Sequence, residues 1–259
     1  MQIVGGYFMK NSLKKLLLLV GLVSATCFVE AGWGLESTAY HEAGHALLSL
    51  FVPQCRSLDR VNIIPNGSTA GECIYLPMSD EEKGRLRDQP TSQALPLIIG
   101  LTAGRVAEEL VFGRADGYQS DYKYATDLAQ LICNYEISFS AERDFLIQKK
   151  ENTAKEFSAK QLHVASSERI RGHLRNLAKS ADCPSPYNYG SNDTEQMYSS
   201  NQLVKDCYQV ATDVLRKNRM ALDMVAQKLL AKKELNANQV RALVHNATLT
   251  ANCRMHSRL

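Results

Sequence analysis

One short segment constrains this chain more than any other. Apolar residues recur at helical spacing over residues 39–50, which predicts an amphipathic helix. Within this stretch lie two histidines and a glutamate, His41, His45 and Glu42. Residues four apart on a helix lie on the same face, so both imidazoles point in one direction. Any fold of this chain must therefore bury the apolar positions of the helix and also give its histidines polar partners.

The residue types in this segment indicate a metal site. Residues 41–45 read His-Glu-Ala-Gly-His and fit the pattern His-Glu-x-x-His. His41 and His45 can hold one cation, and Glu42 lies close enough to orient and deprotonate a metal-bound water without binding the metal. Zinc is the expected ion, because two imidazoles, a carboxylate and an open fourth position match its catalytic geometry. The alternative is a pair of helical histidines packed against the core.

Spacing alone leaves the third metal ligand open. A metzincin site would require Gly and His at the positions of Leu48 and Phe51, so that class is excluded. Glu72, Glu108 and Glu109 are carboxylates that a glutamate-ligated site could use. For Glu108 and Glu109 we favour a helix-surface or packing role.

The remaining pattern predicts a mainly α-helical (α+β) fold with a small antiparallel hairpin beside the histidine helix. Two short runs at 61–65 and 72–77, rich in branched and aromatic residues, flank a turn-forming sequence. A helix over 92–112 has Pro96 near its start and Gly113 at its end. Further helices are expected over residues 121–137, 155–178, 196–217, 220–232 and 238–246.

Capping residues mark the expected starts of three helices. Ser37 or Thr38 would cap the histidine helix, and Ser120 the helix that starts at residue 121. Asn236 and Gln239 have the spacing of a capping box before the last helix.

The first 31 residues have the pattern of an export signal. Three lysines precede an uncharged stretch over 16–29, and Ala31 precedes Gly32. We expect cleavage after Ala31, or an uncleaved signal anchor over residues 13–29 that associates with a membrane. The body of the protein, residues 32–259, would then be extracytoplasmic, as a periplasmic, secreted or membrane-anchored domain. The alternative is a buried N-terminal helix.

Composition excludes some partners and bears on the compartment. Thirty Lys and Arg against 27 Asp and Glu give a net charge of +3, too small an excess for a protein that follows nucleic acid phosphates. We therefore expect no nucleic acid partner. Residues 32–259 hold an even number of cysteines that an oxidising compartment could pair, although the pairing is open. They are Cys55, Cys73, Cys133, Cys183, Cys207 and Cys253.

Several segments together resemble the peptidase domain of FtsH-type membrane AAA proteases. Residues 38–46 look like the zinc helix of that family, and 61–65 followed by Gly71 look like its next strand and turn. Residues 104–113 and 120–129 are similar to the two helical segments that follow. The resemblance is dense from residue 38 to about 140 and resumes more loosely over 204–240. The segment at about 138–203 diverges.

The resemblance implies a helical zinc metalloendopeptidase that hydrolyses polypeptide substrates through a zinc-bound water. Carried over by motif, His41, His45 and Asp121 would be the zinc ligands and Glu42 the catalytic base. The resemblance thus favours Asp121 as the third ligand. A short carboxylate near a helix start has few rotamers, which suits that role.

The chain also departs from that family. Its sequence contains no Gly-Lys dipeptide and so no Walker A loop to bind ATP phosphates. A homo-oligomer or a separate ATPase partner therefore stays open, as do the peptide specificity and the oligomeric state. The alternative function is a non-catalytic zinc-binding or adaptor protein of the cell envelope. Glu42 argues against it, because a site that only binds metal has no need of a base between its ligands.

Export can be tested directly. We expect the mature protein to begin at Gly32, since the lysines, the short apolar stretch and Ala31 together specify a cleavage site. N-terminal sequencing of protein from fractionated cells measures this. A full-length protein found wholly in the cytoplasm would contradict both cleavage and the anchor.

Overall fold

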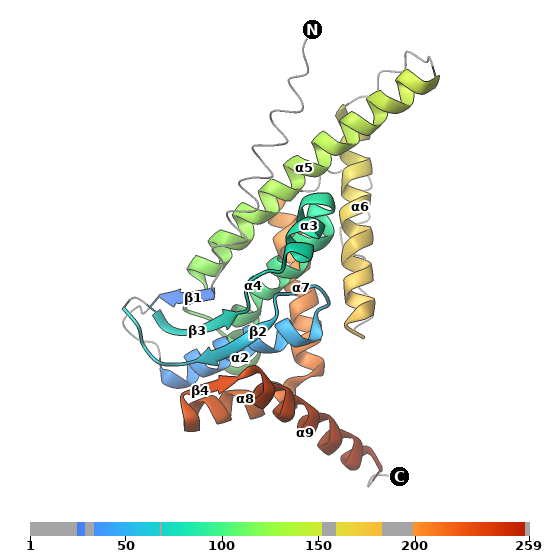
Figure 1. The fold of residues 1–259 in the computed structure, drawn as a ribbon. Helices are drawn as coiled ribbons and strands as arrows, with labels where there is room; N and C mark the ends of the chain where they lie inside the picture. Colours follow the sequence, from blue (N-terminus) through green and yellow to red (C-terminus); the bar gives the residue numbers. More distant parts are fainter. Residues whose placement is uncertain (1–24, 29–33, 68, 152–158, 183–198, 257–259) are drawn as a thin grey trace.

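A computed structural model describes residues 25–28, 34–67, 69–151, 159–182 and 199–256. The described helices are α2 (Leu35–Phe51), α3 (Asp80–Asp88), α4 (Pro90–Phe112), α5 (Gln119–Glu151), α6 (Ala159–Ser180), α7 (Ser200–Lys217), α8 (Arg219–Lys232) and α9 (Ala237–His256). The described strands are β1 (Ala25–Phe28), β2 (Leu58–Asn62), β3 (Thr69–Tyr75) and β4 (Glu234–Asn236). The predicted fold class, mainly helical with a small antiparallel sheet, is confirmed (Figure 1).

Helix α2 runs through the centre of the fold. It packs against α4, α8 and the strands β2 and β3 (Figure 1). Every residue from Thr38 to Leu48 is buried. The prediction of an amphipathic helix is therefore wrong in one respect, because over these three turns the helix has no solvent face. A helix enclosed on all sides must supply partners for its polar side chains from the elements around it.

Small residues allow this close packing. A Cβ atom at Gly44 of α2 would lie 2.6 Å from the carbonyl oxygen of Ala103 and 2.8 Å from the Cβ of Ala107, both on α4. These distances are below van der Waals contact, so only glycine permits the observed approach of the two helix backbones.

The sheet lies against α2 and has the strand order β1-β3-β2-β4, with antiparallel neighbours. The predicted hairpin is β2 and β3, in which Val61 pairs with Cys73 and Asn62 with Glu72. Strands β1 and β4 were not predicted. Strand β4 follows α8 and pairs with β2.

Strand β1 lies within the segment that the sequence assigns to an export signal. The described part of that segment, Ala25–Phe28, is a strand rather than a helix and pairs with β3. Residues 1–24 and 29–31 of the expected signal lie outside the described residues. Signal cleavage and the anchor over 13–29 therefore stay predictions.

Helix ends agree with the capping pattern at some places and not at others. Gly113 ends α4 with a left-handed φ of 72°, as its position predicted. Asn236 and Gln239 exchange two bonds of 3.0 Å, each side chain accepting from the other's backbone N–H. Two predicted caps are wrong. Helix α2 begins at Leu35, which places Ser37 inside its first turn, and α5 begins at Gln119, which places Ser120 inside its first turn.

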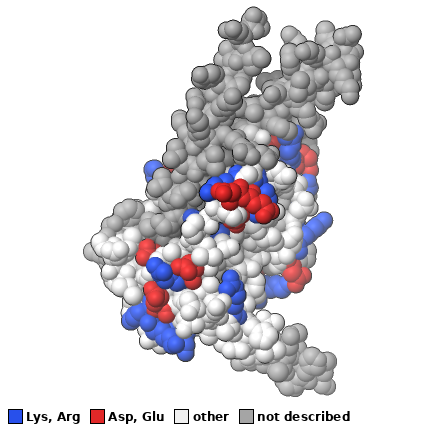
Figure 2. Space-filling model, in the orientation of Figure 1, with Lys and Arg blue, Asp and Glu red and all other residues white. Residues whose placement is uncertain are grey.

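Helix α3 was not predicted, although its start carries a capping box. The Ser79 side chain accepts from the backbone N–H of Glu82, and the Glu82 carboxylate accepts from the backbone N–H of Ser79. Figure 2 shows the charged side chains of α3 on the surface, where Lys83 and Asp80 form one of its exposed ion pairs.

Four of the six cysteines expected in the mature chain are described. Cys55, Cys73, Cys133 and Cys207 carry free thiols, so no disulfide forms among them. The side chains of Cys183 and Cys253 lie outside the described residues. Burial raises the pKa of the Cys133 thiol to about 12, which keeps it protonated at neutral pH.

Two surface properties bear on the expected partners. On the face seen in Figure 2, positive and negative side chains are interspersed over the described residues, in keeping with the small net charge. Within the described ranges, no helix combines the length and apolarity needed to cross a membrane.

The contact at Gly44 gives a stability prediction. We expect Gly44→Ala to lower the free energy of unfolding by about 1 to 3 kcal/mol, because its methyl group must push α2 and α4 apart. Gly172→Ala on α6 is the matched control. It has open space at its Cβ position and should stabilise the helix by up to about 1 kcal/mol. Urea unfolding midpoints compare the two, and equal midpoints would contradict the close packing.

Candidate metal centre

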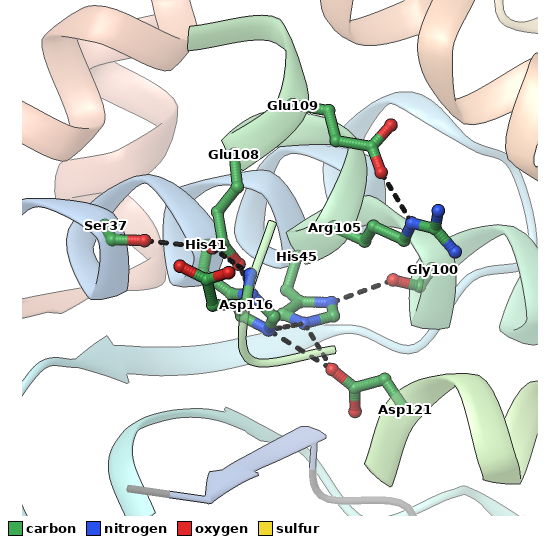
Figure 3. Close-up of polar contacts among 9 residues, drawn as sticks. All are labelled: Ser37, His41, His45, Gly100, Arg105, Glu108, Glu109, Asp116 and Asp121. Atoms are coloured by element: carbon green, nitrogen blue, oxygen red, sulfur yellow. Dashed lines mark hydrogen bonds and ion pairs between the residues drawn. The ribbon is translucent and has the colours of Figure 1, made fainter. Parts of the chain in front are cut away.

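Two helices bring three ligand atoms together in the interior. Helix α2 supplies His41 and His45, and the first turn of α5 supplies Asp121 (Figure 3). The two Nε2 atoms are 3.0 Å apart, and each lies 3.2 Å from Oδ2 of Asp121. All three residues are buried. Among the described residues, they form the cluster of histidine, cysteine and acidic side chains that could hold a metal ion.

The outer nitrogen of each imidazole fixes its tautomer. His45 Nδ1 lies 2.8 Å from the carbonyl oxygen of Gly100, which can only accept, so this nitrogen carries the hydrogen. His41 Nδ1 lies 2.5 Å from Oε1 of Glu108 and donates to that carboxylate. In the neutral rings, both Nε2 atoms then carry lone pairs directed at each other and at Asp121. Three acceptors that face one another in a buried site need a positive charge between them.

The arrangement fits a zinc ion. Tetrahedral ligands at zinc bond lengths of 2.0 to 2.1 Å are separated by about 3.3 to 3.4 Å, close to the observed separations. Oδ1 of Asp121 is also buried and has no hydrogen-bond partner among the described residues. Two imidazoles and one carboxylate leave a fourth position for water or substrate, which is the ligand set of a catalytic zinc site.

Charge balance favours an ionised Asp121. Burial by itself would raise the pKa of this carboxyl, but positive charge on His45 and His41 outweighs burial and holds the pKa below its ordinary value, as a cation bound between neutral rings and the carboxylate would also do. The carboxylate therefore stays ionised at neutral pH, as a metal ligand must.

Glu42 lies where α2 meets β3. Its side chain is buried, and a Cβ atom at Gly71 of β3 would lie 2.9 Å from Glu42 Cγ. The Cys73 thiol donates to the backbone carbonyl of Glu42 at 3.3 Å. Strand β3 thus runs directly beside the residue expected to act as base.

One of the two roles expected for Glu108, that of a helix-surface residue, is wrong. Glu108 is buried, and its carboxylate holds His41 through Oε1 and accepts from the Ser37 hydroxyl through Oε2 at 2.9 Å. The backbone N–H of Asp116 also donates to Oε2, at 3.3 Å. Figure 3 shows this carboxylate reaching from α4 to the histidine. Carboxylates that accept from a ligand imidazole orient the ring and raise its basicity.

The sequence held one signal for this role. Gly104 and Glu108 are four residues apart and share a face of α4, and a Cβ at Gly104 would collide with the His41 ring. The glycine lets the helix backbone lie close to the face of the imidazole. The acidic residue one turn later can then form a hydrogen bond with the ring nitrogen. The serine at position 37 and the carbonyl of Gly100 carried no comparable signal.

The other candidate carboxylates lie elsewhere. Glu109 pairs with Arg105 at 2.7 Å and accepts from the Tyr208 hydroxyl. Glu72 accepts from the Asn62 side chain at 3.3 Å on the sheet. Neither joins the cluster of His41, His45 and Asp121.

Arg105 lies between α7 and the segment that leads into α5. Its guanidinium lies 4.3 Å from the ring centroid of Tyr118, just before α5, and 5.5 Å from that of Tyr208 on α7. The same guanidinium forms an ion pair with Glu109 on α4. This cluster joins three parts of the fold beside the turn that carries Asp121.

A buried His-Glu-x-x-His helix that meets a carboxylate from another helix is the arrangement of a metallopeptidase domain. Residues 34–181 match the sequence profile of Peptidase family M41, which is more than half of the chain. The chain belongs to this family. The matched range continues past residue 138, into the segment at about 138–203 that was expected to diverge.

Curated relatives agree. The chain is 28% identical to the ATP-dependent zinc metalloprotease FtsH of Bacillus subtilis. The 213 aligned residues make up 82% of this chain and 29% of that protein. It is 31% identical to the FtsH of Akkermansia muciniphila, over 80% of this chain and 22% of that protein. It is 30% identical to the FtsH of Thermotoga maritima, over 80% of this chain and 30% of that protein. The chain thus spans less than a third of the length of these relatives.

The contact between Glu108 and His41 predicts an effect on metal affinity. Glu108→Gln should weaken binding of zinc by about 10- to 100-fold, because the neutral amide no longer holds the imidazole as the carboxylate does. Competition with a chromophoric chelator measures the affinity. Glu109→Gln is the matched control, since the neighbouring side chain contacts Arg105 and Tyr208. Equal affinities for the two variants would contradict the role of Glu108.

Proposed function

We propose that this chain is a zinc-dependent metalloendopeptidase. The observation that carries the proposal is the convergence of three acceptor atoms from His41, His45 and Asp121, with Glu42 on the same helix as the histidines. Membership of Peptidase family M41 and relatives named zinc metalloproteases support it. The substrate is a polypeptide, and Zn2+ is the cofactor.

The residues of the site divide the chemistry between them. His41, His45 and Asp121 hold the metal, and Glu108 and the Gly100 carbonyl keep both imidazoles in the tautomer whose Nε2 lone pair can bind it. Zinc, when bound, supplies polarisation of the scissile carbonyl and acidifies water.

Glu42 acts as the general base. Its carboxylate takes a proton from the attacking water and passes it to the amide nitrogen, so that the C–N bond breaks and a neutral amine leaves. Burial beside β3 excludes bulk water from this carboxylate. A base in such a site is held in place before the substrate arrives.

Peptide hydrolysis by this chain is proposed to be independent of ATP. The sequence holds no Gly-Lys dipeptide, and so no phosphate-binding loop of the Walker A type. Unfolded or flexible polypeptides are then the substrates, unless a separate ATPase partner supplies unfolding. Assembly into a homo-oligomer stays open. We propose an extracytoplasmic location, or attachment to a membrane through residues 13–29, on the pattern of the first 31 residues.

The alternative is a zinc-binding adaptor of the cell envelope without catalysis. It needs the three ligands but has no use for Glu42. The variants that follow separate the two functions.

Asp121→Ala tests the ligand set. This variant should weaken zinc affinity at least about tenfold and abolish casein cleavage, because two imidazoles alone leave the ion without its anionic ligand. Glu72→Gln and Glu109→Gln are controls and should keep zinc. Zinc content by mass spectrometry of metals measures the outcome. Stoichiometric zinc in Asp121→Ala, with loss in either control, would mean that the site is ligated by a glutamate.

Glu42→Gln tests catalysis. The variant should keep zinc and fold while casein cleavage falls by roughly three orders of magnitude or more, since the amide cannot accept the proton. Cleavage by the full chain is followed with and without chelator, and ATP should leave the rate unchanged. Comparable turnover by wild type and variant would contradict the proposed peptidase function and would favour the zinc-binding adaptor.

A further inference from the structure

Strand β1 occupies the outer edge of β3. Ala25 pairs with Cys73 and Thr26 with Glu72, in antiparallel register. The other edge of β3 is paired with β2, so without β1 the outer edge would present unpaired backbone N–H and C=O groups.

The two strands that meet at this edge lie close to different parts of the candidate centre. Gly71 of β3 lies against the Glu42 side chain, and Cys73 donates to the Glu42 carbonyl. Strand β1 also contacts α5, whose first turn carries Asp121. In Figure 3 the ribbon of β1 runs beside the sheet on the Asp121 side of the site. The strand therefore lies between the element that flanks the base and the helix that supplies a ligand.

We propose that Ala25–Phe28 is an internal competitor that occupies the edge of β3 on which an extended polypeptide substrate pairs. This inference rests on the proposed function. An extended peptide binds to an open strand edge through main-chain hydrogen bonds that do not depend on its sequence. Residues 71–73 hold such a peptide beside Glu42, and β1 uses the backbone groups of the same stretch.

The occupied edge has a consequence for maturation. The cleavage after Ala31 that the sequence predicts removes Ala25–Phe28 together with the signal. The uncleaved chain thus has its substrate edge covered, and cleavage opens it. Peptidase activity is thereby restricted to the compartment in which the signal is removed.

The full chain, with residues 1–31 retained and verified by mass spectrometry, allows a direct test. Successive backbone N–H groups of a strand point in opposite directions, so prolines at positions 25 and 26 together remove a ladder hydrogen bond whichever residue donates it. The double variant Ala25→Pro, Thr26→Pro should lower KM for casein about tenfold with kcat unchanged, if β1 is docked in about nine of ten molecules. Ala25→Ser, Thr26→Ser keeps both N–H groups and is the matched control. Equal KM values for the two variants overturn the proposal.

A peptide added in trans gives a second readout. A synthetic peptide of residues 22–31 should inhibit the proline variant competitively and the serine control far less. Ala25→Gly, Thr26→Gly weakens the strand without proline and serves if the proline variant does not fold. Inhibition of equal strength in the control and the weakened variant overturns the proposal.

Failure of the proposed peptidase function can be distinguished from failure of the proposal about β1. If no variant cleaves casein, the enzyme is wrong, and the strand is then tested by binding alone. The fluorescein-labelled peptide of residues 22–31 should show higher anisotropy with the proline variant than with the serine control. If both variants bind the peptide equally, or if neither binds it, the proposal that β1 occupies the edge of β3 is overturned.

Discussion

The mutual approach of three buried acceptors is the constraint on which the rest of the structure depends. His41, His45 and Asp121 face one another at 3.0 to 3.2 Å, and all three residues are buried. Such a cluster is unfavourable unless a cation holds it together. The fold supplies hydrogen-bond partners for the outer nitrogen of each ring, the Glu108 carboxylate for His41 and the Gly100 carbonyl for His45. The site and the core are built from the same contacts.

This demand explains why the centre of the protein is made from small residues. Gly44 lets α4 approach α2, Gly104 lets α4 cover the His41 ring, and Gly71 lets β3 pass beside Glu42. A larger side chain at position 44 would push α4 away from α2, whereas at positions 104 and 71 it would collide with His41 and Glu42. Large apolar residues such as Leu47 and Ile98 fill the surrounding layers instead. Packing is thus closest where the chemistry is placed, which holds the side chains in one arrangement.

The local sequence pattern was sufficient to predict helix ends that are determined by residues close in sequence. Gly113 and the pair of Asn236 and Gln239 end or begin helices where predicted, because the stabilising bonds lie within one turn. The start of α2 was misplaced because the Ser37 hydroxyl bonds to Glu108, 71 residues away, rather than to its own helix. Strands β1 and β4 were missed for a similar reason. Each is short and is defined by pairing with a distant strand.

The sequence by itself determined that His41 and His45 share a face, since a helix of 3.6 residues per turn leaves no other outcome at a spacing of four. Its spacing left Glu72, Glu108 and Glu109 open as third ligands, and the family resemblance favoured Asp121. Only the tertiary structure shows which carboxylate lies beside the imidazoles, because these residues lie far along the chain from the histidines and their direction depends on how helices pack. Glu108 and Glu109 are adjacent, yet successive residues on a helix point about 100° apart. One therefore reaches His41 while the other meets Arg105, and the position beside both Nε2 atoms goes to Asp121.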